Sequence, residues 1–198
     1  MLDNQRARGF IGHVINPVAR ALLAVGLSAS AVTIIGSLGS ILVSVLLIAQ
    51  GRFVLAFVLM TPLVAADLLD GAMARMTGTS GPWGSFLDST TDRITDGAMF
   101  AAFVWWAAQQ SGALAFAAST ALIAGFVTSY ARAKAESVNV ACKVGIAERA
   151  ERVIGVMVAA LLQGLGVPYV LPAMLWLLAA LSCITVWQRM RVVYKALR

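Results

Sequence analysis

Residues 53–92 of the chain read FVLAFVLMTPLVAADLLDGAMARMTGTSGPWGSFLDSTTD. The stretch opens with an apolar run, residues 53–75, long enough to cross a hydrocarbon core of about 30 Å as a helix rising about 1.5 Å per residue. A short connection from Met76 to Trp83, rich in Gly, Thr, Ser and Pro, leads into a second run. Helices joined by so short a connection are antiparallel neighbours. The stretch therefore predicts a helical hairpin in a membrane, with aspartates on both sides of its turn.

The rest of the chain repeats this apolar pattern. Of its 198 residues, 60% are hydrophobic and 12% are charged, which lies outside the range of soluble globular domains. Six runs of membrane-spanning length can be drawn, at residues 31–50, 53–75, 86–109, 113–135, 148–164 and 169–191. We therefore expect an all-α integral membrane protein whose six transmembrane helices form one domain, residues 26–198.

The segment 1–25 differs in composition from these runs. Arg6, Arg8 and Arg20 alternate with apolar residues such as Ile15, a pattern typical of an amphipathic helix on the membrane surface. A secretory signal peptide would need an uninterrupted apolar core and a small-residue cleavage site after the first arginines, and neither follows. We therefore expect an interfacial, juxtamembrane helix here.

Basic residues are distributed unevenly over the predicted loops. If the amino end is cytoplasmic, the loops on the opposite side lie near residues 50–53, 109–113 and 163–168, and Arg52 is their single basic residue. Cytoplasmic loops are enriched in Lys and Arg. The distribution therefore places both termini in the cytoplasm, and it accounts for the formal charge of +6. Nucleic-acid binding, the other usual reason for a basic chain, has no soluble module here to carry it.

Cysteine and histidine usage limits the kind of metal site that the chain can build. Cys142 and Cys183 are too few and too separated for a disulfide framework or a zinc knuckle, and we expect both to be packing residues. Because His13 is the only histidine, a metal site would have to be built from oxygen ligands.

Aspartates cluster where a membrane protein can least accommodate them. Asp67 and Asp70 are three residues apart and Asp88 and Asp92 are four apart, so that each pair shares one helix face. A charged side chain within a span is unfavourable by at least a few kcal/mol, which makes it a candidate functional group. Converging carboxylates repel one another unless cations lie between them, and oxygen ligands select hard ions such as Mg²⁺, with Mn²⁺ as a substitute.

The acidic pairs have a second interpretation. Arg75 and Arg93 are near enough in sequence to form buried ion pairs with them. Small residues are equally ambiguous. Gly71 and Ala74 share the face of the first pair and Gly84 precedes the second, and they leave room either for a ligand or for close helix packing.

The order of these residues carries a family resemblance. Asp67-Leu-Leu-Asp70-Gly71-Ala-Met-Ala74-Arg75, then eight residues, then Gly84-Ser-Phe-Leu-Asp88-Ser-Thr-Thr-Asp92, resembles the signature of the CDP-alcohol phosphotransferases at every defining position. The resemblance implies a six-helix membrane enzyme, usually a homodimer, that transfers a lipid phosphate from a CDP-activated lipid to an alcohol at the cytoplasmic leaflet.

The same resemblance implies roles for individual residues. Two Mg²⁺ ions are expected on four aspartates: Asp67, Asp70, Asp88 and Asp92. Asp92 is also the expected catalytic base that deprotonates the acceptor's hydroxyl. The expected CDP-lipid-binding residues are Thr33, Gly71, Ala74, Arg75 and Gly84. Asp96 lies outside the signature, and we leave it as either a support for the site or a partner of a neighbouring arginine.

The second half of the chain favours an anionic acceptor. Basic residues gather at helix ends, namely Arg132, Lys134, Arg149, Arg152, Arg189 and Arg191. Arginine suits phosphate, although the topological bias toward basic loops explains such residues as well. The stretches around Arg132, Arg152 and Arg189 resemble the actinobacterial phosphatidylinositol-phosphate synthases. That resemblance implies CDP-diacylglycerol and inositol phosphate as substrates, these three arginines as acceptor-phosphate ligands, and a bacterial cell membrane as the location.

Two alternatives stay open. Phosphatidylglycerophosphate synthases share the signature and take glycerol 3-phosphate. A divalent-cation transporter would also line its path with aspartates, but here the aspartates lie at one end of the predicted bundle. The entry to the first span, Gly26 to Thr33, departs from the family, which often has a proline there.

Overall fold

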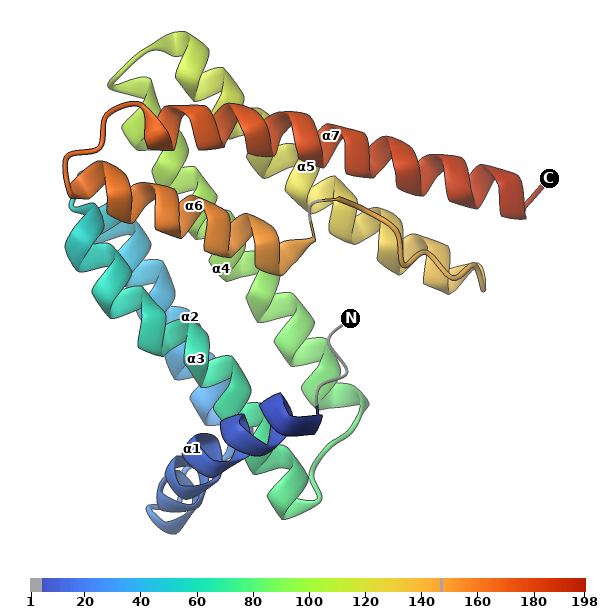
Figure 1. The fold of residues 1–198 in the computed structure, drawn as a ribbon. Helices are drawn as coiled ribbons and strands as arrows, with labels where there is room; N and C mark the ends of the chain where they lie inside the picture. Colours follow the sequence, from blue (N-terminus) through green and yellow to red (C-terminus); the bar gives the residue numbers. More distant parts are fainter. Residues whose placement is uncertain (1–4, 147) are drawn as a thin grey trace. The chain divides into compact units, whose positions relative to one another are not determined.

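The computed structural model describes residues 5–146 and 148–198, with side chains described from Ile15 onward. In this part of the chain the regular structure is entirely helical (Figure 1). The helices are α1 (Gln5–Ala24), α2 (Ala29–Val43), its π-helical continuation η1 (Ser44–Ile48), α3 (Phe53–Thr77), α4 (Pro82–Ala108), α5 (Gly112–Ser137), α6 (Arg149–Gly164) and α7 (Val170–Ala196).

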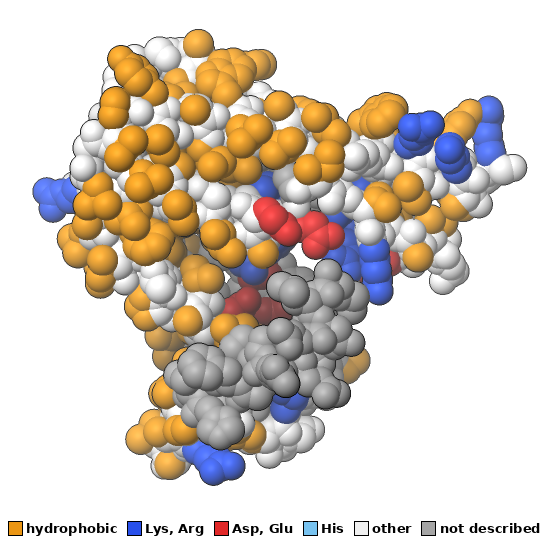
Figure 2. Space-filling model, viewed as in Figure 1, with side chains coloured by type: hydrophobic (Ala, Val, Ile, Leu, Met, Phe, Trp, Pro, Cys, Tyr) orange, Lys and Arg blue, Asp and Glu red, His pale blue; other side chains and the backbone are white. Residues whose placement is uncertain are grey.

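Each predicted apolar run corresponds to one helix, from α2 with η1 through α7. Among the described residues, four helices are long and apolar enough to cross a membrane: Ala29–Ile48, Phe53–Thr77, Gly112–Ser137 and Val170–Ala196. The other two predicted spans fall short, because α4 carries Asp88, Asp92, Arg93 and Asp96 in its first half and α6 has only 16 residues. Figure 2 shows hydrophobic side chains over much of the visible surface. An all-α integral membrane protein is thus confirmed.

One compact unit is formed by the residues up to Leu42 and by Val58–Thr95. Its core contains Ala19 of α1, Val32 of α2 and the neighbouring Ala72 and Met73 of α3. The second half of the predicted interfacial helix therefore packs its apolar side against α2 and α3, while Arg20 is exposed. Arg6 and Arg8, which also belong to the predicted amphipathic pattern, lie outside the described side chains.

Glycines set the contact between α2 and α3. A Cβ added at Gly36 would lie 3.2 Å from Ala66 Cβ, and one at Gly39 would lie 2.8 Å from Leu63 Cδ2. Small residues let membrane helices approach this closely. As residue numbers rise along α2, those of the contacting residues fall along α3, so the two helices are antiparallel. One turn before Gly36, the same register brings Thr33 opposite Asp70.

The second unit is formed by Val43–Phe57 and Asp96–Arg198. In it α7 packs against α5 and α6 (Figure 1). The buried face of α5 consists of small residues such as Ala117, Ala121 and Ala124, whereas α7 buries Leu171 and Leu175. The buried face of α5 is thus rich in small side chains, which let membrane helices approach closely.

The connection between α5 and α6 is held against α7. Ile146 N donates to Thr185 Oγ1 at 3.2 Å, and Arg189 Nε donates to Val144 O at 2.9 Å. At Gly145, where φ is 148°, an added Cβ would lie only 2.5 Å from Thr185 Cγ2. Cys142, predicted to be a packing residue, is fully buried in this connection, whereas Cys183 is exposed.

Candidate functional site

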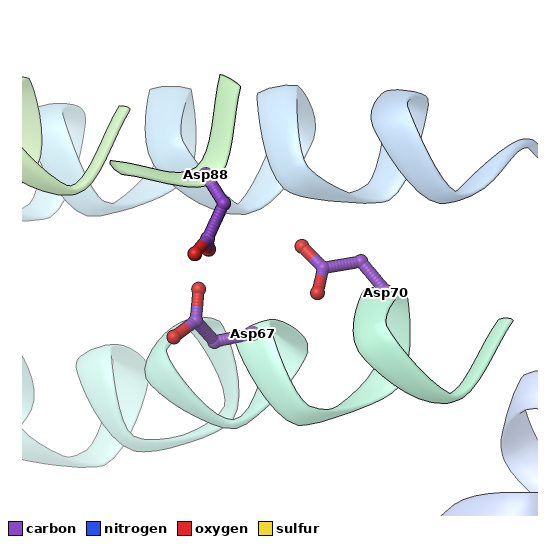
Figure 3. A group of neighbouring side chains, drawn as sticks. All are labelled: Asp67, Asp70 and Asp88. Atoms are coloured by element: carbon purple, nitrogen blue, oxygen red, sulfur yellow. The ribbon is translucent and has the colours of Figure 1, made fainter. Parts of the chain in front are cut away.

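Three of the predicted aspartates come together at one point of the first unit. Asp67 and Asp70 project from the same face of α3, and Asp88 reaches them from the start of α4 (Figure 3). One carboxylate oxygen from each lies within 4.8 Å of the others. Asp70 is buried at 8% exposure, Asp88 is half-buried and Asp67 is exposed. The hairpin turn predicted from the sequence is what brings the two helices' acidic faces together.

A hydroxyl from α2 fixes the most buried of these carboxylates. Thr33 Oγ1 donates to Asp70 Oδ2, and it also lies 3.1 Å from its own helix's Ala29 O. The sequence suggested Thr33 as a nucleotide contact through family resemblance. In the structure its described role is to orient a carboxylate, and this follows from the Gly36 and Gly39 register that places α2 on α3.

The three aspartates fit a divalent cation. Three negative charges held this close repel one another unless a cation lies between them. Their donor atoms are all carboxylate oxygens, which suit hard ions such as Mg²⁺ or Mn²⁺. The group is enclosed at Asp70 and exposed at Asp67. The first unit therefore carries a candidate metal centre on Asp67, Asp70 and Asp88.

Asp92, predicted as the fourth ligand and the base, lies one turn beyond Asp88 and is not part of the group of three described above. Its Oδ2 lies 3.8 Å from Arg93 Nη2, so the ion pairing considered as an alternative does occur at this position. The Asp92 side chain retains 16% exposure. It is therefore placed beside the group rather than within it.

Asp96 belongs to the second unit and has a different role. Arg149 Nε donates to Asp96 Oδ2 at 3.1 Å and to Oδ1 at 3.3 Å, and this ion pair links α4 to the first turn of α6. The sequence left two roles open for Asp96, a support for the site or a partner of an arginine. The structure shows the second.

Four of the predicted CDP-lipid residues lie on α3 and α4 close in sequence to the aspartates, and three of these four are small. An added Cβ at Gly71 would lie 3.4 Å from Arg75 Nη1, so the exposed Arg75 folds back over this glycine. Ala74 is half-buried on the same helix. Gly84 is exposed on α4, and an added Cβ there would meet nothing within 4 Å. These positions leave open surface beside Asp88.

Two of the three predicted acceptor arginines converge on α5 in the second unit. Arg152 and Arg189 are each only 3% exposed. Arg189 Nη1 donates to Thr128 O at 2.6 Å, and the Arg152 guanidinium lies over Gly125, where an added Cβ would be 3.5 Å from its Cζ. Gly125 and Thr128 are one turn apart, so both cations meet the same turn of α5. A Gly-x-x-Thr spacing in an otherwise apolar span is the signal that sequence reasoning missed.

The remaining basic residues of the predicted group are arranged differently. Arg132 is the third predicted acceptor ligand. Its Nε forms an ion pair at 3.0 Å with Glu136 on the same helix, and its side chain is 43% exposed. Arg149 is paired with Asp96, and Arg191 is exposed two residues beyond the buried Arg189. The six cations therefore do not form one uniform cluster.

Comparison with known proteins places these features in a family. The profile of the CDP-alcohol phosphatidyltransferases matches residues 27–188. A phosphatidylinositol phosphate synthase of Cutibacterium acnes is 40% identical over 99% of both chains, and that of Streptomyces avermitilis is 38% identical over 94% of this chain and 80% of its own.

Solved structures give the same result. The phosphatidylinositol phosphate synthase of Mycobacterium tuberculosis with CDP-DAG bound superposes with a TM-score of 0.88 at 36% identity, over 92% of this chain and 94% of that one. The same enzyme with manganese and citrate gives a TM-score of 0.86 at 37% identity, over 90% and 88%. With its aspartate signature, helical membrane fold and matches over nearly its whole length, the chain belongs to the CDP-alcohol phosphatidyltransferase family.

Proposed function

We propose that this protein transfers the phosphatidyl group of CDP-diacylglycerol to inositol phosphate, which yields phosphatidylinositol phosphate and CMP. The observation that carries the proposal is the convergence of Arg152 and Arg189 on one turn of α5. Both guanidinium groups are buried, and Arg189 Nη1 donates to a backbone carbonyl of this turn, so that its positive charge is held in place. Because arginine suits the bidentate recognition of phosphate, a phosphorylated acceptor is the ligand that this pair of cations favours. The related synthases are named for a phosphatidylinositol phosphate product.

The cluster of three aspartates on α3 and α4 is the proposed metal centre. Asp67, Asp70 and Asp88 would hold two Mg²⁺ ions, with Mn²⁺ as a substitute, and Asp92 would contribute to the second. When bound, these cations neutralise the diphosphate and the leaving phosphate. The manganese in the related mycobacterial structure supports a divalent ion.

The reacting hydroxyl belongs to the acceptor, and Asp92 is the proposed base. The acceptor's oxygen attacks the phosphorus that carries diacylglycerol, the bond from that phosphorus to the bridging oxygen breaks, and CMP leaves. The proton of the hydroxyl passes to the Asp92 carboxylate. A positioned base of this kind contributes roughly 10²–10⁴-fold to the rate. Its 16% exposure leaves Asp92 reachable by a bound hydroxyl.

The other site residues would bind and orient the substrates. Gly71, Ala74, Arg75 and Gly84 would accept the CDP part on the open surface beside Asp88, and Thr33 would act indirectly by orienting Asp70. Arg152 and Arg189 would hold the acceptor's phosphate. Arg132 would join them only by exchanging its partner Glu136, at 3.0 Å, for that phosphate.

The membrane arrangement completes the proposal. We propose that α2 through α7 form six transmembrane helices in one domain, residues 26–198, with residues 1–25 at the membrane surface. The uneven distribution of basic residues supports cytoplasmic amino and carboxyl ends in a bacterial cell membrane. The family resemblance supports a homodimer.

The test is release of CMP by the purified protein with Mg²⁺ and CDP-diacylglycerol, comparing inositol phosphate, free inositol and glycerol 3-phosphate. Turnover with inositol phosphate alone is expected. Turnover with glycerol 3-phosphate instead would assign the protein to the phosphatidylglycerophosphate synthases. Uptake of Mn²⁺ into protein-containing vesicles, without CMP release, would support the cation-transporter alternative.

A further inference from the structure

The end of α7 carries two parallel stripes of exposed side chains. The apolar stripe consists of Trp187, Met190, Tyr194 and Leu197, which are 59%, 64%, 56% and 61% exposed. The cationic stripe consists of Arg191, Lys195 and Arg198, which are all exposed. In Figure 2, Lys and Arg side chains gather where α7 ends in Figure 1.

Helical periodicity places both stripes away from the packed face of α7. That face is marked by Ser182, Thr185 and Arg189, which are at most 3% exposed. At about 100° per residue, the helical members of the apolar stripe lie roughly 100–160° around the helix from Arg189, and those of the cationic stripe roughly 200–240°. Leu197 and Arg198 follow directly after the helix ends at Ala196. Neither stripe therefore serves the contact with α5.

Cation–π contacts couple the two stripes. Arg191 Cζ lies 5.3 Å from the centroid of the Trp187 ring, and Arg198 Cζ lies 4.8 Å from that of Tyr194. A guanidinium over an aromatic face is held in place but keeps its N–H donors at the edge of the plane. The charges are thus fixed beside the aromatic rings and can still donate hydrogen bonds to oxygen atoms.

The position of the stripes along α7 matches the boundary of a bilayer. The 27 residues of α7 extend about 40 Å, against about 30 Å for a hydrocarbon core. The stretch from Val170 to Trp187 contains no charged residue and covers about 27 Å. The exposed Leu177 and Ile184 continue the line of the cationic stripe into that stretch. The cations therefore begin where the hydrocarbon ends, at the depth of phospholipid head groups.

We infer that these two stripes form a binding surface for the head groups of anionic phospholipids. Aromatic rings settle at the head-group level, and basic side chains just outside a span attract negatively charged lipids. A second copy of the chain fits less well, because a two-fold contact through this face would bring like charges together. The inference stands on α7 alone and does not depend on the proposed reaction.

Trp187 can report on its own lipid neighbours. The purified protein is reconstituted in phosphatidylcholine that contains either brominated phosphatidylcholine or brominated phosphatidylglycerol. Quenching at Trp187 is obtained by subtracting the signal of the Trp187→Phe variant. The ratio of the two quenching efficiencies measures the preference for the anionic lipid at this surface.

We expect the anionic lipid to be preferred about fivefold or more at low salt. The preference should fall toward one as salt rises, because screening shortens the range of these charges. The triple variant Arg191→Gln, Lys195→Gln, Arg198→Gln should also lower it to about one. Its matched control replaces three other exposed cations by glutamine, Arg52, Lys134 and Lys143, for the same change in charge, and should keep the preference.

Several results would overturn the inference. A ratio near one in the protein with its native charges, or one that does not respond to salt, would exclude an electrostatic lipid surface without relying on the charge variants. An equal loss in the control variant would show that total charge matters rather than this stripe. A Trp187 that neither lipid quenches would show that protein, such as a second copy, covers the face instead.

Discussion

The hydroxyl of Thr33 supports the carboxylate site from a different helix, and its removal should weaken metal binding. Thr33→Val keeps the size and branching of the side chain but removes the proton donated to Asp70 Oδ2. Asp70 is only 8% exposed, so little water can replace the lost donor. A hydrogen bond to a charged group contributes about 1.5–3 kcal/mol, which corresponds to roughly a 10- to 150-fold change in affinity. Loss of a residue that orients a metal ligand typically weakens metal binding by about 10–100-fold, in agreement.

The assay is direct titration of Mn²⁺, with the free ion followed by electron paramagnetic resonance. Thr33→Ser, which keeps the hydroxyl, should retain most of the affinity. Thr120→Val is the matched control, because among the described residues Thr120 Oγ1 bonds only its own helix, at Phe116 O, 2.8 Å away. An unchanged Mn²⁺ affinity in Thr33→Val would refute the reasoning, and so would an equal loss in Thr33→Ser.

Three further predictions test other parts of the molecule. Asp92→Asn should lower single-turnover release of CMP by roughly 10²-fold or more while CDP-diacylglycerol still binds, and near-normal turnover would remove Asp92 as the base. Arg152→Gln should raise the KM for inositol phosphate by about 10-fold or more with little effect on that for CDP-diacylglycerol, as measured by initial rates with each substrate varied; equal effects on both would contradict a phosphate contact. Gly145→Ala should destabilise the protein by about 1–3 kcal/mol in thermal unfolding, because its Cβ would lie 2.5 Å from Thr185 Cγ2 at a φ of 148°. Gly166→Ala, at a φ of 94° with open space, isolates the backbone contribution of about 1 kcal/mol and should be milder.

The helices and the acidic group could be predicted because each depends on local spacing. Apolar runs of spanning length marked α2 through α7, and the i,i+3 pair of Asp67 and Asp70 fixed a shared face without knowledge of any other helix. The short connection after Thr77 then required α4 to return beside α3. These are properties of neighbouring residues. The structure confirms the helices and the acidic group, and four of the described helices have the length and apolar composition needed to cross a membrane.

Features that depend on contacts between distant segments could not be predicted. Gly36 and Gly39 decide which residue of α2 meets Asp70, but the chain has 17 glycines and nothing local distinguishes these two. The same holds for the acceptor arginines. Arg132 and Arg152 look alike in sequence, yet one is paired with Glu136 at the surface and the other is buried over Gly125. Side-chain rotamers and helix rotation settle such differences.

The partners of Arg189 affect how readily it could bind an anion. Its Nε and Nη1 donate to the backbone carbonyls of Val144 and Thr128, which are neutral. The side chain is thereby already immobilised, so a bound phosphate would not have to supply the roughly 0.5–1.5 kcal/mol needed to order it. Nor would that phosphate have to displace a carboxylate, as it would at Arg132. Arg189 is thus preorganised with its positive charge unneutralised by these two partners, and a lysine, whose ammonium lacks the planar fork of donors, could not reproduce that geometry.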